Sequence, residues 1–447
     1  MRFRGAFLNR GAFLNLTRYD TMSENRETLR IRNACGLLSQ ASRSVRILTH
    51  LSWPVQVRER FFADKEKELP RVVYSEFDPS DALERVVLAR ASFKCEQIVN
   101  EWLHISAFNI ETAAKMLAAR GTPDFFRYSA ELYGLPHDLL SDHENSTLQL
   151  AMQFDSTFEK FEGMELAGLD DSIVTASEVA SAIRLEVQKA FGEKAPKVSL
   201  VDDLSANALA GPSRIRIRRG AVFTDRDVQQ LIHHEAHVHV GTWLNGLAQP
   251  NVSILAASRP GTTATQEGLA VFSEFITGSM DLNRFRRLAD RVIAIQMAID
   301  GADFLDVYRF YLERIGDREQ AFENARRVFR GGLLSGGSPF TKDILYLEGL
   351  LKVHNFLRTM VSVGRADCLR LLFCGKLDLE NLPVVGILAS RGICHPPKFL
   401  PPWAKDMRFL LCYLTYSSFL NKIDLAQVKV HYEQMLQAIP RQADPRN

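Results

Sequence analysis

The stretch LIHHEAHVHV at residues 231–240 carries four histidines and one glutamate within seven positions. Thr224 or Asp225 upstream is a suitable N-cap, and the pattern between predicts a helix that ends at Gly241. Because a helix fixes the direction of every side chain, the spacing of the histidines decides which imidazoles converge. This segment therefore constrains the fold more than any other in the chain.

His233 and His237 have the four-residue spacing of the H-E-x-x-H helix, in which both imidazoles reach one metal ion. Four residues leave the two side chains about 40° apart around a regular helix, so they share a face. Glu235, however, lies about 200° from His233 and points away from that face. This pair thus offers two ligands without a neighbouring base.

His234 and His239 instead form H-E-x-x-x-H, in which Glu235 directly follows the first histidine, the place of a general base for a zinc-activated water. In a regular helix, five residues leave these imidazoles about 140° apart. A π-helical turn of about 4.4 residues brings them within about 50°. We therefore predict a widened turn between Glu235 and His239. His237 and His233 then support a ligand histidine from behind or pack against neighbours.

A catalytic zinc needs a third protein ligand and one open position. Glu267, in TQEGLA at the start of a helix expected from about Thr265, is the candidate, and Gly268 permits close approach. Glu274, seven residues later on the same face, is expected to orient a ligand histidine through its other ring nitrogen. A solvated histidine-rich helix face is the alternative, which three ligands from two helices would exclude.

The rest of the chain is predicted to be mainly helical α+β with one small sheet. Apolar residues recur at helical spacing through most of 28–191 and again at Leu282–Ile299, 303–315 and Arg318–Phe329. The alternating RIRIRR at 214–219 predicts a strand before the histidines. We divide the chain into a segment 1–25 that repeats RGAFLN and is expected to be disordered or a mis-annotated start, a helical region 26–195, a catalytic metallopeptidase core 196–362 and a helical region 363–447.

Composition excludes several classes of protein. With 46% apolar and 24% charged residues and a formal net charge of +2, the chain is typical of a soluble globular protein and lacks the basic excess of a nucleic-acid binder. No apolar run is long enough for a membrane span or a signal peptide, so a cytoplasmic location is expected. The six cysteines form no CxxC pair, which favours reduced core residues.

Four motifs together are more specific than any of them alone. HEAHVH is followed by QEGLA about 30 residues later, then by FRGG and PFTKDILYLEG. This series, over roughly 214–360, resembles the tyrosine carboxypeptidase family typified by the microtubule-associated enzyme, whose bacterial branch comprises flavohaemoglobin expression-modulating QEGLA-motif proteins. The resemblance implies that His234, His239 and Glu267 hold one Zn²⁺, and that the reaction removes a C-terminal Tyr or Phe. Peptide or protein C-termini are then the expected partners; no oligomeric state is predicted.

The zinc chemistry assigns further roles. Glu235 is expected to take the proton from the attacking water and pass it to the leaving amine. Recognition of a free carboxylate favours a cation, and Arg330 in RRVFRGG and Lys342 in PFTKD are the candidates. Tyr346 is a candidate donor to the developing oxyanion. Trp243, Phe272 and Phe340 are possible linings of an aromatic pocket, but each residue is as compatible with the core, so none is assigned.

Two other functions remain open on the sequence. One is a non-catalytic regulatory protein with a structural metal, although Glu235 beside a ligand has no purpose in such a site. The other is a zinc aminopeptidase or endopeptidase, which would not need a free substrate carboxylate. The leading hypothesis is a zinc metallocarboxypeptidase.

Overall fold

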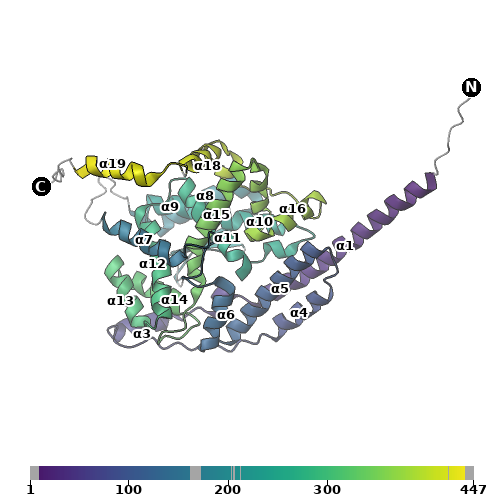
Figure 1. Cartoon of the computed structure of the whole chain (residues 1–447). Coiled ribbons are helices and arrows are strands. Elements are labelled where there is room, and N and C mark those ends of the chain that lie inside the picture. Colours follow the sequence, from purple (N-terminus) through teal and green to yellow (C-terminus); the bar gives the residue numbers. More distant parts are fainter. Residues whose placement is uncertain are drawn as a thin grey trace, which may run out of the picture.

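The computed structural model describes residues 10–161, 173–202, 204, 207–211, 213–420 and 422–437, and Figure 1 shows a largely helical body with small sheets. This confirms the predicted helical α+β class. Residues 1–9 of the RGAFLN segment lie outside the described residues. The backbone is helical from Arg10 onward, and the expectation for residues 1–25 stays a prediction.

The N-terminal region is helical, as its spacing predicts. The first helix runs along α4 and α5, while its N-terminal half projects from the body in Figure 1. An extended stretch that lacks regular structure joins α3 to α4. The helices are α1 (Arg10–Ser44), α2 (Ile47–His50), α3 (Val55–Ala63), α4 (Ser80–Ala91), α5 (Gln97–Ala118), α6 (Pro123–Tyr133) and α7 (Thr147–Glu159).

The described residues form two small sheets, where one was predicted. A two-stranded antiparallel sheet pairs β1 (Ile173–Thr175) with β5 (Val222–Thr224). A three-stranded sheet has the order β2-β4-β3. Its centre is β4 (Arg214–Arg218), the strand predicted from RIRIRR; β2 (Lys197–Val201) pairs with it in parallel and β3 (Ala208–Gly211) antiparallel. Helix α8 (Ala176–Phe191) and the short η1 (Gly192–Lys194) come between β1 and β2 in sequence.

The histidine segment is one continuous helix of changing pitch. Thr224, one of the two predicted N-caps, caps α9 (Asp225–Leu231), and it forms a capping box with Asp227. The π-helix η2 (Ile232–Val240) follows, so the predicted widened turn is confirmed and spans the whole histidine cluster. The predicted stop at Gly241 is wrong. Gly241 adopts right-handed helical angles, and the chain continues as α10 (Gly241–Leu247).

Two helices meet unusually closely behind the site. A Cβ on Gly268 of α11 (Thr263–Ile276) would lie 2.2 Å from the carbonyl oxygen of Gly349 in α15 (Leu345–Ser362). The glycines of QEGLA and LEG thus permit this helix contact, whereas the sequence suggested an approach to the histidine helix. Before α11 come η3 (Ser253–Ala256) and η4 (Pro260–Thr262), and between α11 and α15 come α12 (Leu282–Ile299), α13 (Phe304–Ile315), α14 (Arg318–Phe329) and η5 (Thr341–Ile344).

The buried apolar residues form two cores that meet at η2. The larger core joins the N-terminal helices to α11–α15 and includes Val238. The smaller core joins α8, α9 and the strands and includes Ala236 and Val240. Ala236 and Val240 thus pack into one core and Val238, between them, into the other, which fixes the rotation of the π-helix. The boundaries at 195 and 362 remain predictions.

The C-terminal region contributes short helices to the larger core. They are η6 (Ala366–Phe373), η7 (Leu379–Asn381), α16 (Leu382–Ser390), α17 (Pro402–Lys405), α18 (Arg408–Leu420) and α19 (Leu425–Gln437). Among the described residues, none of the helices has the length and apolar character that crossing a bilayer requires.

Candidate active site

Three side chains from two helices converge. The Nε2 atoms of His234 and His239 lie 3.6 and 3.5 Å from the same oxygen, Oε2 of Glu267. One ligand atom from each residue lies within 4.8 Å of the others. Tetrahedral zinc ligands at about 2.0–2.1 Å from the ion lie roughly 3.4 Å apart, and the two measured separations are close to this value. A solvated histidine face does not describe these side chains, since His234 is only 6% exposed.

The ligand geometry follows from the π-helix. The rings of His234 and His239 are 4.8 Å apart and nearly perpendicular, although five residues separate them. Residues 233 and 237 have the regular spacing, yet their rings are 5.6 Å apart, and His237 Nε2 contacts Glu186 of α8 at 3.2 Å. His237 therefore packs toward α8 and does not touch a candidate ligand. Burial lowers the pKa of His233 and of His237 to about 4.

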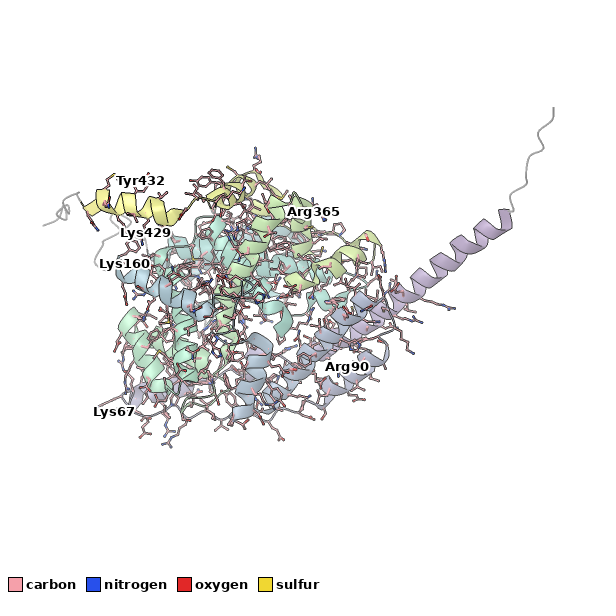
Figure 2. The ribbon with its side chains drawn as sticks, in the orientation of Figure 1. Lys67, Arg90, Lys160, Arg365, Lys429 and Tyr432 are labelled. Carbon is pink, nitrogen blue, oxygen red and sulfur yellow. The ribbon has the colours of Figure 1, made fainter. Side chains whose placement is uncertain are left out.

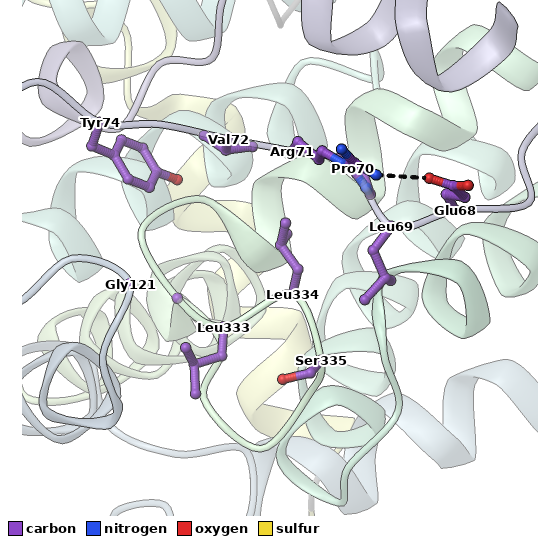
Figure 3. Close-up of a pocket in the computed structure, with 11 residues that line it drawn as sticks. Glu68, Leu69, Pro70, Arg71, Val72, Tyr74, Gly121, Leu333, Leu334 and Ser335 are labelled. Atoms are coloured by element: carbon purple, nitrogen blue, oxygen red, sulfur yellow. Dashed lines mark hydrogen bonds and ion pairs between the residues drawn. The ribbon is translucent and has the colours of Figure 1, made fainter. Parts of the chain in front are cut away.

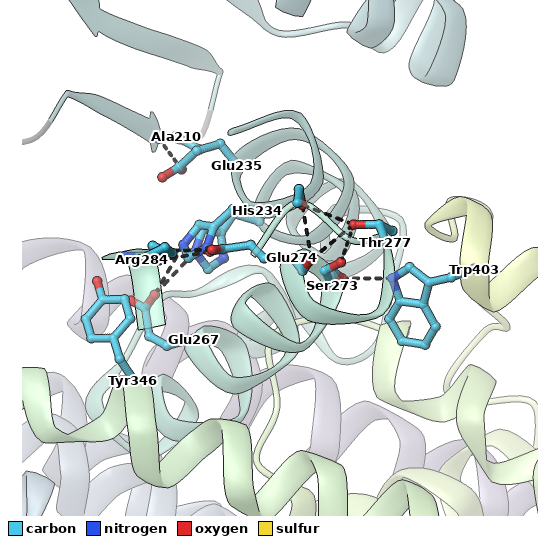
Figure 4. A network of polar contacts seen from close by, with 12 residues as sticks. Ala210, His234, Glu235, Glu267, Ser273, Glu274, Thr277, Arg284, Tyr346 and Trp403 are labelled. Carbon is cyan, nitrogen blue, oxygen red and sulfur yellow. Dashed lines mark hydrogen bonds and ion pairs between the residues drawn. The ribbon is translucent and has the colours of Figure 1, made fainter. Parts of the chain in front are cut away.

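Behind His234 lies a chain of paired charges (Figure 4). Its Nδ1 is 2.6 Å from Oε1 of Glu274, so the predicted contact with Glu274 is present. Arg284 of α12 donates to both oxygens of Glu274 at 2.8 Å. Burial alone would raise the pKa of Glu274, but Arg284 and His234 lower it to about 2. Glu274 is therefore an anion that fixes the ring of His234.

Glu235 is buried beside the ligands and faces the sheet. Its Oε2 accepts a hydrogen bond from the backbone N–H of Ala210 in β3, at 2.7 Å. Figure 4 shows Ala210 and Glu235 on the side of His234 that is opposite Tyr346. The strand thus holds the carboxylate of Glu235 in place next to His234.

Lys342 connects the ligand set to a basic group of residues. Its Nζ lies 3.3 Å from Oε1 of Glu267 and 5.1 Å from the centre of the Tyr346 ring. Burial would raise the pKa of Glu267, but Lys342 and the two histidines lower it well below its usual range. Lys342 therefore lies beside the candidate ligand Glu267, and Tyr346 lies beside Lys342.

Further arginines surround Tyr346. Arg327 donates to Asp343 at 2.6 Å and to the Tyr346 hydroxyl at 3.4 Å. The guanidinium of Arg291 lies 4.4 Å from the centre of the same ring, and its Nη1 has no hydrogen-bond partner among the described residues. Arg330 lies over Phe340, 3.9 Å from Asp343 and not beside Glu267. Burial lowers the pKa of Arg291 and of Arg330 to about 10.

These cations outnumber their partners. In the described part of the chain, two carboxylates, Asp343 and Glu267, lie within reach of four cations, Arg291, Arg327, Arg330 and Lys342. If Glu267 binds a metal, Asp343 alone remains. Such burial is costly without an anion. Lys67, Arg365 and Lys429, in contrast, are at the surface (Figure 2).

Sequence reasoning missed Arg284, Arg291, Arg327 and the strand contact of Glu235. It also missed Lys376, which donates to Ser258 at 2.6 Å. Burial lowers the pKa of Lys376 to about 8, although the carboxylates of Glu267 and Glu235 oppose this shift. An isolated arginine or lysine gives no sequence signal, because most such residues are solvated. A buried carboxylate such as Glu274 needs a cation nearby, and this need is the signal that could have indicated Arg284.

Two hollows of the surface lie away from the candidate ligands. A pocket of 640 Å³ is formed by residues 68–74 and the loop 332–335 (Figure 3). Another of 340 Å³ contains Trp243. Neither contains a candidate ligand, and Phe272 and Phe340 are fully buried in the larger core. None of these three aromatic residues is therefore assigned to substrate.

A family model described as microtubule-associated tyrosine carboxypeptidase matches residues 59–422. The chain belongs to this family. Membership implies tyrosine carboxypeptidase activity on peptides or proteins, and the match extends beyond the motifs at 214–360 into both flanking helical regions. No curated protein gives a significant match.

Proposed function

We propose that this family member is a zinc-dependent carboxypeptidase that removes a C-terminal Tyr or Phe. The observation that carries the proposal is the triangle of His234 Nε2, His239 Nε2 and Glu267 Oε2, with sides near 3.5 Å where they are measured. Imidazole and carboxylate are zinc ligands, and three protein ligands are typical of a catalytic site. The preference for Tyr or Phe rests on the family alone.

The proton transfers are assigned to Glu235. A zinc ion held by the three ligands would supply a Lewis acid for the attacking water and the peptide carbonyl. Ala210 occupies Oε2 of Glu235, so Oε1 is the oxygen assigned to the water. Glu235 accepts the water proton and delivers it to the nitrogen of the departing amino acid.

Tyr346 is assigned to the developing oxyanion. Arg327 donates to its hydroxyl oxygen, which leaves the phenolic proton for another acceptor. Cations around the ring favour negative charge in this part of the site. Both contacts support the role proposed from the sequence.

The basic group is assigned to the substrate carboxylate. Three bonds separate the scissile carbonyl carbon from the terminal carboxylate carbon, so the two lie within about 4 Å. The cation that binds the carboxylate must therefore lie close to the metal ligands, and Lys342 is the candidate because it contacts Glu267. Arg330 contributes charge from behind Asp343, and Arg291 has an unpaired N–H. An anion bound here would balance the excess of buried cations.

The test is a release assay on peptides that end in each amino acid, as free acids and as amides. We expect Tyr and Phe to be released only from the peptides with a free C-terminal carboxylate. A chelator should abolish this release, and added zinc should restore it. Glu235→Gln should retain zinc and lower kcat by about 10²- to 10⁴-fold. Equal cleavage of amides would indicate an endopeptidase or aminopeptidase. Metal binding without any release, in wild type and Glu235→Gln alike, would indicate the regulatory alternative.

A further inference from the structure

A segment of the N-terminal region reaches the turn that follows Arg330. The chain between α3 and α4 is extended, and no backbone–backbone hydrogen bond joins residues 67–74 to the rest of the described chain. At Tyr74, however, the hydroxyl oxygen lies 2.7 Å from the backbone nitrogen of Gly331 and 2.8 Å from Nε1 of Trp53. Both nitrogens donate, so one phenol oxygen satisfies two N–H groups. Figure 3 shows Tyr74 beside the loop that follows Gly331.

Arg120 holds the extended segment around Tyr74. Its guanidinium lies 5.3 Å from the centre of the Tyr74 ring and 6.0 Å from that of Phe77. It also donates to the carbonyl of Ser75 at 2.7 Å and to that of His50 at 2.8 Å. A planar guanidinium that stacks on a ring and bonds to the adjacent main chain restricts the direction of that ring. Burial raises the pKa of Tyr74, so its hydroxyl stays neutral.

The bond to Tyr74 changes how α14 ends. At a common glycine cap, the N–H of the glycine bonds back to a carbonyl of the helix. Gly331 has the positive φ of such a cap, 87°, but its N–H bonds to Tyr74 instead, and Arg330 before it has a ψ of 121°. The carbonyl of Gly331 accepts from the N–H of Gly121 at 2.9 Å. The direction of the chain after α14 therefore depends on contacts with the N-terminal region.

Arg330 is the residue whose placement this turn decides. It directly precedes Gly331 and is only 7% exposed, with its guanidinium 5.5 Å from the centre of the Phe340 ring. Its Nη2 lies 3.9 Å from Asp343, and its Nε has no hydrogen-bond partner among the described residues. A buried donor without a partner is costly, so an acceptor that arrives with the substrate gains from it.

We infer that Tyr74 is a positioning residue for the substrate carboxylate: its hydroxyl holds the turn at Gly331, and the turn holds Arg330 in the basic group. The inference rests on the proposed peptidase function and on the assignment of the basic group to the carboxylate. Tyr74 itself touches no substrate. Without the phenol oxygen, the N–H of Gly331 is free to bond back to a helix carbonyl, and this common cap gives Arg330 another direction.

The first test compares affinities for an acid and an amide. The ligands are two hexapeptides that end in Tyr, one as the free carboxylate and one amidated, whose last peptide bond is replaced by CH2–NH to prevent cleavage. Calorimetry on the zinc-loaded protein gives the acid-to-amide affinity ratio. We expect Tyr74→Phe to lower this ratio by about 3- to 10-fold, the value of one hydrogen bond, with little change in affinity for the amide.

Trp53→Phe is the matched control for this test. It removes the other donor to the Tyr74 hydroxyl and leaves the bond from Gly331 in place, so we expect the wild-type ratio. Thermal unfolding of both variants verifies the fold. A purely structural role of Tyr74 would lower the unfolding temperature without changing the ratio. An unchanged ratio in Tyr74→Phe, or an equal fall in both variants, would overturn the inference.

The second test asks whether Tyr74 acts through Arg330. In an Arg330→Met background the side chain to be positioned is absent, so Tyr74→Phe should lower the acid-to-amide ratio no further. The four proteins of this double-mutant cycle are measured with the same two ligands. An equal loss in both backgrounds would contradict the path through Arg330.

The third test needs no variant. Coupling is reciprocal, so a turn that raises the affinity for the carboxylate must itself be stabilised by the bound carboxylate, by the same factor. Exchange of the Gly331 amide hydrogen requires its bond to Tyr74 to open. With the wild-type protein saturated by either ligand, this exchange should be about 3- to 10-fold slower with the acid than with the amide. Equal exchange rates would count against the positioning role.

The two proposals fail separately. If the ratio depends on Tyr74 as expected but no peptide is ever cleaved, the positioning role stands and the peptidase function fails. If Tyr is released by wild type and by Tyr74→Phe with the same preference for a free carboxylate, the peptidase function stands and the positioning role fails.

Discussion

The two sides of the candidate active site differ in how their charges are balanced. On the histidine side, made of His234, His239, Glu267, Glu274 and Arg284, each buried charge has a partner and the ligand atoms surround one point. On the arginine side, made of Arg291, Arg327, Arg330, Lys342, Asp343 and Tyr346, cations exceed carboxylates and Arg291 Nη1 is unpaired. The proposed zinc ion would complete the first side, and the proposed substrate carboxylate would complete the second.

This difference matches the end of a peptide. The terminal residue presents a carbonyl to be polarised and, three bonds further, a carboxylate to be bound. A cation site next to an anion site can bind the carbonyl and the carboxylate at the same time only if the carboxylate belongs to the terminal residue of the substrate. An endopeptidase would have no use for the surplus of buried cations, because an internal residue carries no carboxylate at that position.

The largest effect is expected from removal of a ligand on the histidine side. His239→Ala should abolish stoichiometric zinc and lower kcat/KM by about 10⁴-fold or more, the scale for loss of a central catalytic group. Its matched control is His237→Ala, on the same π-helix, because His237 contacts Glu186 and no candidate ligand. Metal analysis and a release assay measure both. Zinc retained by the first variant and lost by the second would reverse the assignment of the two histidine pairs.

Replacement of a buried arginine should change the free energy of unfolding differently on the two sides. Arg284→Met leaves the buried Glu274 without its cation and should lower the free energy of unfolding by about 3–5 kcal/mol. Arg291→Met removes one of the surplus cations, so we expect no loss, or a gain of about 1 kcal/mol. Denaturant unfolding of the two variants compares them directly. A loss of several kcal/mol for Arg291→Met would show that the arginine side is balanced without substrate.

A smaller effect is expected for substrate binding on the arginine side. Lys342→Met should raise KM about 10- to 100-fold for peptides with a free C-terminus, the value of a charge-assisted hydrogen bond, with a smaller change in kcat. Lys352→Met, in helix α15, which directly follows the η5 turn that carries Lys342, is the control outside the site. If Lys342→Met still prefers peptides with a free C-terminal carboxylate over amidated peptides as strongly as the wild type does, another cation binds the carboxylate.

The sequence predicted the histidine side much better than the arginine side, for a physical reason. The five-residue spacing of His234 and His239 is incompatible with a shared metal in a regular helix, so the π-helix could be inferred from chemistry. The bounds of α12 and α14 also followed from apolar spacing. The stop at Gly241 failed because glycine tolerates helical angles when both flanking segments are packed.

Charge balance and strand edges, in contrast, depend on tertiary contacts. Arg291 and Arg327 occupy amphipathic helices whose sequence is equally compatible with solvated arginines, and only the packing of α12, α14 and α15 buries them. The edge strand ALAG escaped notice because alanine and glycine have low strand propensity. Its pairing with β4 is decided by register, which one sequence does not specify.

The smallest predicted effect is on the loss of folding stability at low pH. Burial would raise the pKa of Asp343, but the cations led by Arg327 and Lys342 lower it below its usual range. A carboxylate with a depressed folded-state pKa contributes stability above its unfolded pKa near 4, and this contribution is lost as the pH falls through the folded value. Each unit of lowering is about 1.4 kcal/mol. Denaturant unfolding at pH 6 and pH 3 should therefore show less acid sensitivity for Asp343→Asn than for wild type. Equal sensitivity would mean that Asp343 does not balance the arginine side, which would leave every cation there dependent on the substrate carboxylate.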